Sequence, residues 1–212
     1  MEEKRIMGNF IQIGAGAGDL DTRVGCRDGF SELVKSLDPS MIGKIVLVEP
    51  NPINIPFLEK CWANYPQAEI HNIGICVEAD RNSTIRFYYA EEDAPNYQVF
   101  SMVKDHVLKH YPNVEPKHTD VNCIPLLDLI DKSIGLQTEI ELLSLDIEGI
   151  DAEILLDTDW SRVNCNLLSF EHLHIPAQLH QTITNHLNDC GLFYVGPGID
   201  VHGYDTLFGR KN

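Results

Sequence analysis

The sequence predicts one α/β domain of Rossmann-like type, with a mostly parallel sheet and helices on both faces. Strand-like and helix-like segments alternate along the chain, which is the pattern of crossover units that feed a parallel sheet. A glycine-rich turn follows the first strand-like segment, and acidic residues follow several others. The length of 212 residues suits one hydrophobic core, so we expect residues 1–212 to form a single domain.

The first half of the chain predicts two strand–helix units and then two more strands. Phe30, Leu33, Val34 and Leu37 recur at helical spacing after the glycine turn. Pro56 stands where a first helical turn tolerates proline. The expected elements are strand 9–13, helix 30–37, strand 44–48, a helix beginning near Pro56, strand 68–72 and strand 84–89.

The second half begins with a less regular stretch. Residues 91–118 contain three prolines, so we expect an insertion that lies over the site and binds substrate, with one helix marked by Phe100, Val103 and Val107. Later segments predict helix 124–134, strand 141–145, a helix from Asp151, strand 166–170, helix 179–190 and strands 192–195 and 206–209. The short, glycine-rich connection between the last two strands predicts an antiparallel pair at the end of the sheet.

The charge and the hydropathy of the sequence exclude some classes of partner. The formal net charge is −16, and no block of Lys or Arg offsets it, so we do not expect nucleic acid as a partner. The N-terminal residues lack the pattern of a signal peptide, and no apolar stretch approaches the ~20 residues that span a bilayer. We therefore expect a cytoplasmic protein without a membrane span.

The segment from Gly14 to Asp21, GAGAGDLD, predicts a nucleoside-binding turn. Gly14, Gly16 and Gly18, with Ala15 between them, permit a tight turn that a ligand can approach closely. The alternative is a glycine-rich turn without a ligand. Asp19 stands where a dinucleotide fingerprint has its third glycine, and its charge opposes a pyrophosphate but suits a cationic sulfonium or ammonium.

Glu49, followed by Pro50, ends the second predicted strand. An acidic side chain there can accept hydrogen bonds from both hydroxyls of a ribose. The two neighbouring strand ends thus predict a site for one nucleoside, formed by Gly14, Ala15, Gly16, Gly18, Asp19, Glu49 and Pro50. The missing fingerprint glycine favours S-adenosylmethionine over NAD as the cofactor.

Carboxylates also follow a central strand. In LLSLDIEGIDAEIL, Asp146 and Glu148 come directly after the strand and lie next to Gly149. The carboxyl ends of central strands border the ligand crevice of open α/β sheets, so these side chains are placed for chemistry. The alternative is that Glu148 and Asp151 only cap the following helix.

A third group, Glu171, His172 and His174, lies in SFEHLHIP beyond the next strand. Alternate side chains at a strand end can face the same crevice. The group is interpreted as a general base or as part of a weak metal site formed by Asp146, Glu148, Glu171 and His172, and the alternative is a structural role for the histidines. A divalent metal is not expected to be required.

With these motifs in place, the chain resembles the FkbM-type methyltransferases. Three blocks carry the likeness: FIQIGAGAGDLD, VLVEPNPINIPFLEKCWANYP, and ELLSLDIEGIDAEILLDTDW with LLSFEHLHIP. The resemblance implies a seven-stranded sheet with a reversed last strand. It also implies that Gly14, Gly16, Gly18 and Glu49 contact S-adenosylmethionine and that Asp146 lies close to its methionine end. Gln12 departs from the acidic residue that many methyltransferases have in the first motif.

The family likeness further implies O-methylation of hydroxyls on sugars, polyketides and related secondary metabolites, so the expected partner is a small-molecule or glycan acceptor. In this interpretation His172 or His174 takes the hydroxyl proton near neutral pH, and Glu148 is the next candidate for the base. Asp146 is assigned an orienting role. Two other functions are considered, an NAD-linked dehydrogenase and a non-catalytic nucleoside-binding protein of the same fold.

Overall fold

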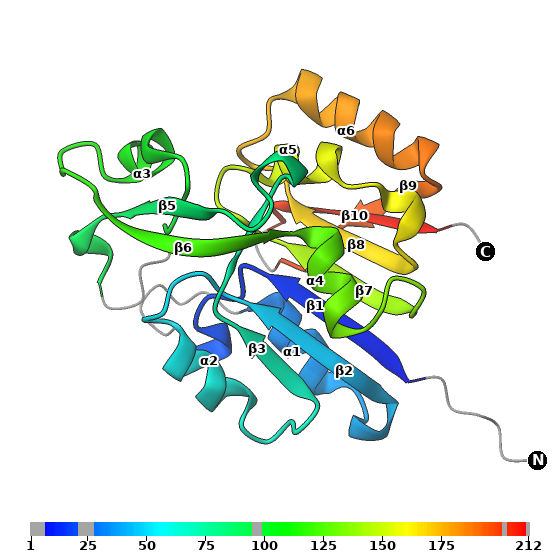
Figure 1. The fold of residues 1–212 in the computed structure, drawn as a ribbon. Coiled ribbons are helices and arrows are strands. Elements are labelled where there is room, and N and C mark those ends of the chain that lie inside the picture. The colour runs from blue at the N-terminus through cyan, green and yellow to red at the C-terminus, as the bar shows by residue number, and fades with distance from the viewer. Residues whose placement is uncertain (1–6, 21–27, 95–98, 201–202, 211–212) are drawn as a thin grey trace, which may run out of the picture.

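A seven-stranded sheet forms the centre of the computed structural model, which describes residues 7–20, 28–94, 99–200 and 203–210 (Figure 1). The strand order is β3-β2-β1-β7-β8-β10-β9, and the pairs from β3 to β8 are all parallel. The predicted fold class is confirmed. The strands are β1 (Gly8–Ile13), β2 (Ile42–Val48), β3 (Ala68–His71), β7 (Ile140–Leu145), β8 (Cys165–Glu171), β9 (Leu192–Pro197) and β10 (Asp205–Arg210).

The last strand runs against its neighbours. β10 lies between β8 and β9 and is antiparallel to both, which confirms the predicted antiparallel pair. Asp205 pairs with Glu171 and Phe208 with Leu168, so β10 brings Asp205 next to the carboxyl end of β8. Part of the connection before β10, and Asp21 of the predicted glycine segment, fall outside the described residues.

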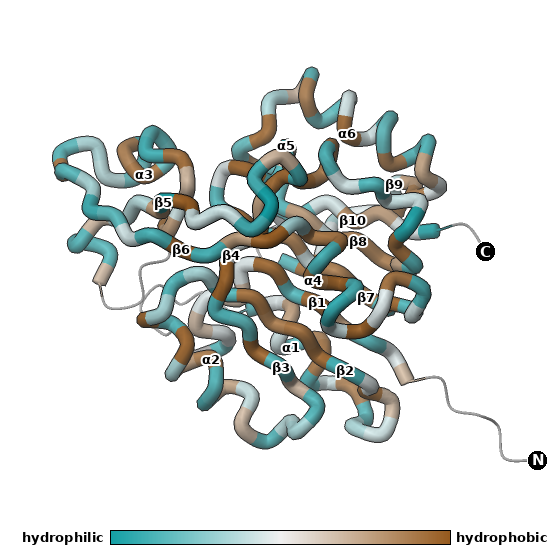
Figure 2. Tube along the Cα trace, viewed as in Figure 1, coloured by the Kyte–Doolittle hydropathy of each residue, from teal (hydrophilic) through white to brown (hydrophobic). Residues whose placement is uncertain are grey.

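Helices cover both faces of the sheet because apolar side chains alternate along its strands. Ile11, Ile13 and Leu143 point to the face covered by α4, α5 and α6, whereas Phe10 and Leu142 point to the face covered by α1 and α2. In Figure 2 the hydrophobic colour follows the strands of this central sheet. The helices are α1 (Gly29–Ser36), α2 (Ile55–Trp62), α4 (Leu126–Ser133), α5 (Asp151–Asp157) and α6 (Ala177–Asp189).

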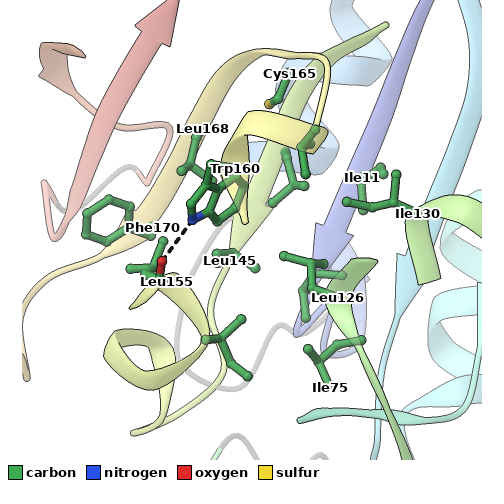
Figure 3. Close-up of a cluster of buried hydrophobic side chains, with 14 of the residues drawn as sticks. Ile11, Ile75, Leu126, Ile130, Leu145, Leu155, Trp160, Cys165, Leu168 and Phe170 are labelled. Carbon is green, nitrogen blue, oxygen red and sulfur yellow. Dashed lines mark hydrogen bonds between the residues drawn. The ribbon is translucent and has the colours of Figure 1, made fainter. Parts of the chain in front are cut away.

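Trp160 anchors the larger of these two cores. It begins the short 3₁₀ helix η5 (Trp160–Arg162) and is fully buried, packed among the side chains labelled in Figure 3. Its indole Nε1 donates a hydrogen bond to the Leu155 carbonyl at 2.8 Å, the dashed line in Figure 3. This bond ties η5 to α5 without leaving a buried donor unpaired.

A second, three-stranded sheet with the order β4-β6-β5 lies beside the main one and extends to the left in Figure 1. It consists of β4 (Gly74–Cys76), β5 (Thr84–Tyr89) and β6 (Lys117–Pro125), with α3 (Lys104–His110) beside β5. The sequence predicted β5 but neither β4 nor β6. The helix expected over 124–134 begins only at Leu126, because β6 continues to Pro125, and the helix expected around Phe100 begins at Lys104.

Four more 3₁₀ turns complete the described elements: η1 (Gly18–Leu20), η2 (Pro39–Met41), η3 (Glu78–Asp80) and η4 (Glu91–Asp93). Across the described ranges, no helix combines the length and the apolar character that crossing a membrane requires.

Candidate functional site

A cavity of about 410 Å³ opens where the carboxyl ends of β1, β2, β7 and β8 meet. Open α/β sheets bind ligands at this edge. The predicted site residues on its wall are Gly14, Ala15, Gly16, Gly18, Glu49, Pro50, Asp146, Glu148 and Glu171, whereas Asp19, His172 and His174 are not among its lining residues.

The glycine turn forms one wall of the cavity. Gly14 has a φ of +78°, and a Cβ there would lie 1.7 Å from the Asp146 carbonyl oxygen, so glycine is needed for close packing against the end of β7. Gly16 also has a positive φ, +53°, but nothing lies within 4 Å of its Cβ position. The turn therefore offers open backbone to a ligand at Gly16.

Asp19 lies behind this turn. Its carboxylate accepts hydrogen bonds from Lys35 Nζ at 2.7 Å and from Cys61 Sγ at 2.8 Å. Partial burial raises the pKa of Asp19, but the hydrogen bonds from Cys61 and Lys35 outweigh it, and the net shift is downward. The charge of Asp19 is thus paired with Lys35.

Glu49 is buried at the end of β2 and holds the turn. Its Oε2 accepts a hydrogen bond from the Gly16 N–H at 2.7 Å, and its Oε1 accepts from the Asn51 N–H at 2.9 Å and from Asn54 Nδ2 at 3.3 Å. Burial raises its pKa to about 7 despite these donors. The side chain therefore links the ends of β1 and β2 and changes charge near neutral pH.

Asp146 and Glu148 stand together after β7. Asp146 has an exposed side chain that lines the cavity, yet many protein atoms lie around its carboxyl group. This surrounding protein raises its pKa well above the usual value, and the charge of Glu148 raises it further. Asp151 does not cap α5 by its side chain. It accepts a hydrogen bond from the Ile147 N–H at 2.9 Å and so fixes the loop that carries both carboxylates.

Glu171 ends β8 on the same cavity wall. Burial raises its pKa to about 8, and the charges of Glu148, Asp151 and Asp205 add to the shift. Asp205, which the sequence did not single out, also lines the cavity because β10 pairs with β8. Four carboxyl groups thus converge from three strands: Asp146, Glu148, Glu171 and Asp205.

The two histidines that follow β8, His172 and His174, lie in different surroundings. His172 Nδ1 shares a hydrogen bond with Thr206 Oγ1 at 2.9 Å, and its ring lies against His180. His174 instead meets His106 and His110 of α3, and partial burial together with the charge of His106 lowers its pKa. Among the described residues, the group whose ligand atoms lie close enough to hold a metal ion is His106, His110 and His174. This group shares no residue with the metal site expected from the sequence.

Gln12 and Asp28 are cavity residues that the sequence did not assign to the site. Gln12 Nε2 donates to Asp28 Oδ1 at 3.0 Å, and Asp28 caps α1 by accepting from the Phe30 and Ser31 N–H groups. The buried Oε1 of Gln12 has no hydrogen-bond partner among the described residues. The position of Asp28 directly before a helix is the signal that would have found it, since aspartate is a preferred N-cap.

His106 and His110 were also missed. They are four residues apart on α3, the spacing that puts two histidines on one face of a helix. His106 is buried, and its Nε2 lies 2.7 Å from Glu148 Oε2. A search of the 91–118 segment for paired histidines would have found both.

The sheet order, the glycine turn after β1 and the carboxylate after β2 define a class, the nucleoside-binding α/β enzymes. Within that class the chain belongs to the FkbM methyltransferase family, because the family model described as "Methyltransferase FkbM domain" matches residues 12–194. The resemblance stated from the motifs is confirmed. The protein is an S-adenosylmethionine-dependent methyltransferase, and the NAD-linked dehydrogenase is set aside.

Solved structures with a similar fold are distant in sequence. Methanococcus jannaschii fibrillarin, a pre-rRNA processing protein, is 11% identical, with a TM-score of 0.45, over 100% of this chain and 70% of the other. Aeropyrum pernix fibrillarin with natively bound S-adenosyl-L-methionine is 11% identical, with a TM-score of 0.44, over 98% and 69%. A TehB-like S-adenosylmethionine-dependent methyltransferase from Corynebacterium glutamicum is 9% identical, with a TM-score of 0.38, over 97% and 82%. No curated protein sequence matches the chain.

Proposed function

We propose that the chain methylates a hydroxyl group of a small polyhydroxylated acceptor, a sugar or a related secondary metabolite. The observation that carries the proposal is the group of four carboxyl groups on the cavity wall, among which Glu171 has a pKa of about 8. Carboxylates accept hydrogen bonds from hydroxyl groups, and a hydroxyl must lose its proton as it is methylated. A carboxyl with a pKa near neutral is suited to take that proton.

We place the cofactor's adenosine against the wall formed by the glycine turn and Glu49. Glu49 lies where it can accept hydrogen bonds from the ribose hydroxyls, and the open backbone at Gly16 allows close approach. Two buried acceptors of residues that line the cavity, Gln12 Oε1 and Asn54 Oδ1, have no hydrogen-bond partner among the described residues.

When bound, S-adenosylmethionine supplies a methyl group on a cationic sulfonium, and its transfer to the acceptor oxygen leaves neutral S-adenosylhomocysteine. The chain contributes charge and position to this reaction. Glu148 places negative charge beside the cavity, which favours a cation there, and a bound cation in turn favours the ionised form of Asp146 by lowering its raised pKa. A cation in turn lowers the pKa of Glu171, so that its carboxylate is free to accept the hydroxyl proton as the carbon–oxygen bond forms.

The experiment is a screen of methyl transfer into a panel of sugars and hydroxylated metabolites, read by the mass of the product. For the acceptor that is found, Glu171→Gln should lower kcat by about 10²–10⁴-fold, far more than it changes the Kd for S-adenosylmethionine. Glu153→Gln, on the exposed side of α5, is the matched control and should keep the wild-type rate.

Three outcomes would overturn parts of this proposal. A full rate in Glu171→Gln together with a large loss in His172→Ala would move the proton acceptor to His172. Methylation only of nitrogen or carbon acceptors across the panel would remove the hydroxyl assignment, and cofactor binding without any transfer would indicate a non-catalytic protein of this fold.

A further inference from the structure

Three histidine side chains meet at one edge of the cavity. His106 and His110 come from α3, and His174 comes from the segment between β8 and α6. The ring centroids are 5.0 Å apart for His106 and His110, 5.0 Å for His106 and His174, and 5.7 Å for His110 and His174. The fold therefore gathers three nitrogen ligands from two distant parts of the chain.

The distances among the three histidine ligand atoms are close to those around a bound transition metal. One ligand atom from each histidine lies within 4.8 Å of the other two. A tetrahedral ion with metal–nitrogen bonds of about 2.0–2.1 Å needs ligand atoms roughly 3.3 Å apart. His110 and His174 are exposed and can close this difference by rotating, whereas buried His106 is the fixed member.

The surroundings orient the His106 ring. Glu148 Oε2 lies 2.7 Å from its Nε2, which leaves Nδ1 as the ligand atom. A Cβ at position 149 would lie 3.1 Å from this Nδ1, so glycine at that position keeps the nitrogen uncovered. Glu148 is itself held, because Ser101 Oγ donates a hydrogen bond to its carbonyl at 2.5 Å. Carboxylates commonly orient histidines that bind metals in this way.

We propose that His106, His110 and His174 bind one zinc ion, and that Glu148 is a positioning residue for the His106 ring. Three imidazoles without a thiolate suit zinc and copper(II) or nickel(II), whereas magnesium and calcium prefer oxygen ligands. Of the nitrogen-preferring metals, zinc is the one we assign, because it accepts a tetrahedral set with three protein ligands.

Three protein ligands leave a fourth coordination position, as in catalytic zinc sites. His110 and Glu148 both line the cavity, so that position faces the space in which an acceptor is proposed to bind. On the proposed function, the acceptor oxygen would occupy it, and the ion would lower the pKa of the hydroxyl that loses its proton. Zinc binding itself does not depend on that function.

The test measures metal binding without cofactor or acceptor. The full chain is stripped with EDTA, dialysed and titrated with Zn²⁺ by calorimetry, and the expected result is one ion per chain. Cobalt(II) in place of zinc should give the visible absorption of a four-coordinate site. Glu148→Gln should weaken binding by roughly 10–100-fold. His110→Ala and His174→Ala should weaken it further and remove the cobalt spectrum, while the control His118→Ala, an exposed histidine of β6, should bind as the wild type does.

Wild-type affinity in both His110→Ala and His174→Ala, or no binding by a folded wild-type chain, would overturn the proposal. Circular dichroism of each variant separates loss of the site from loss of the fold. The methyl-transfer proposal has an independent readout: zinc binding without transfer leaves the site intact and removes the hydroxyl acceptor, and transfer unaffected by EDTA in a zinc-binding chain removes only the role of the fourth position.

Discussion

Gly14 and Gly16 of the nucleoside turn both have a positive φ, but only Gly14 packs against another part of the chain. Substitutions at the two positions should therefore have different effects on stability. Gly16→Val should abolish S-adenosylmethionine binding, because a β-branched side chain fills the ligand's approach and disfavours a φ of +53°. The fold should survive, since nothing lies within 4 Å of that Cβ position. Calorimetry reports the binding, and unchanged circular dichroism is the condition for interpreting it. Gly14→Ala is the contrasting variant: its Cβ meets the Asp146 carbonyl, so it should lose stability as well.

Glu49 gives the second prediction at this scale. Glu49→Ala should weaken S-adenosylmethionine binding by about 1–3 kcal/mol, because ribose hydroxyls and the Gly16 N–H lose their acceptor. The matched control is Glu59→Ala on the exposed side of α2. Equal affinities of the two variants, measured by calorimetry on folded protein, would mean that the ribose lies elsewhere.

Residues at strand ends could be predicted from the sequence, because parallel strands deliver their carboxyl ends to one edge. That rule alone placed Gly16, Glu49, Asp146 and Glu171 on the cavity wall. The rule could not predict His106. The contact of His106 with Glu148 depends on how α3 packs, and the periodicity of the strands carries no information on that packing. The rule also treated His172 and His174 alike, although β10 holds one and α3 meets the other.

Among the elements, η5 and α2 provide a matched pair of buried tryptophans. Trp160 and Trp62 are both nearly inaccessible, but only Trp160 has an acceptor for its indole N–H among the described residues. Trp160→Phe and Trp62→Phe remove the same atoms, but Trp160→Phe removes the hydrogen bond to Leu155, whereas Trp62→Phe alters the contact of Lys35 Nζ with the Trp62 ring. We expect Trp160→Phe to lower the free energy of unfolding by about 1–3 kcal/mol more in urea titrations. Equal losses would show that the bond contributes nothing to stability.

The central strands and their helices were predicted well because each presents a full run of apolar residues to the core. β6 was not, because only Val121 and Cys123 are buried apolar positions along most of its length, while Lys117, Asp120 and Asn122 are exposed. A strand of a small side sheet buries one face sparsely, so its period-2 signal is weak. β4 is three residues long and offers no period at all.

For the molecule as a whole, stability should fall as the pH rises above neutral. Burial raises the pKa of Glu49 to about 7 and that of Glu171 to about 8, from an unfolded value of 4.5. The folded chain therefore binds more protons than the unfolded chain up to these values, and the free energy of unfolding decreases with pH. Urea titrations between about pH 7 and 8 should show this decrease, because the ordinary pKa of histidine, about 6.5, lies below that interval.

The same linkage predicts that S-adenosylmethionine binds more tightly as these carboxyl groups ionise. A cation favours the charged carboxylates, so binding releases protons and the Kd falls over the same pH range. Glu171→Gln should flatten both the stability and the affinity profiles. A stability that rises with pH in the wild type would contradict the upward shifts.

The position of β10 also affects folding during synthesis. The ribosome delivers β9 before β10, but in the described sheet β9 is bonded only to β10. Until residues 205–210 emerge, β9 has no paired strand and β8 is an open edge, a surface that other nascent chains can join. At about 5–20 residues per second, the interval is on the order of a second. Asp205 completes the wall beside Glu171 in the same step, so the group of carboxyl groups proposed to meet the acceptor is assembled only after β10 has inserted.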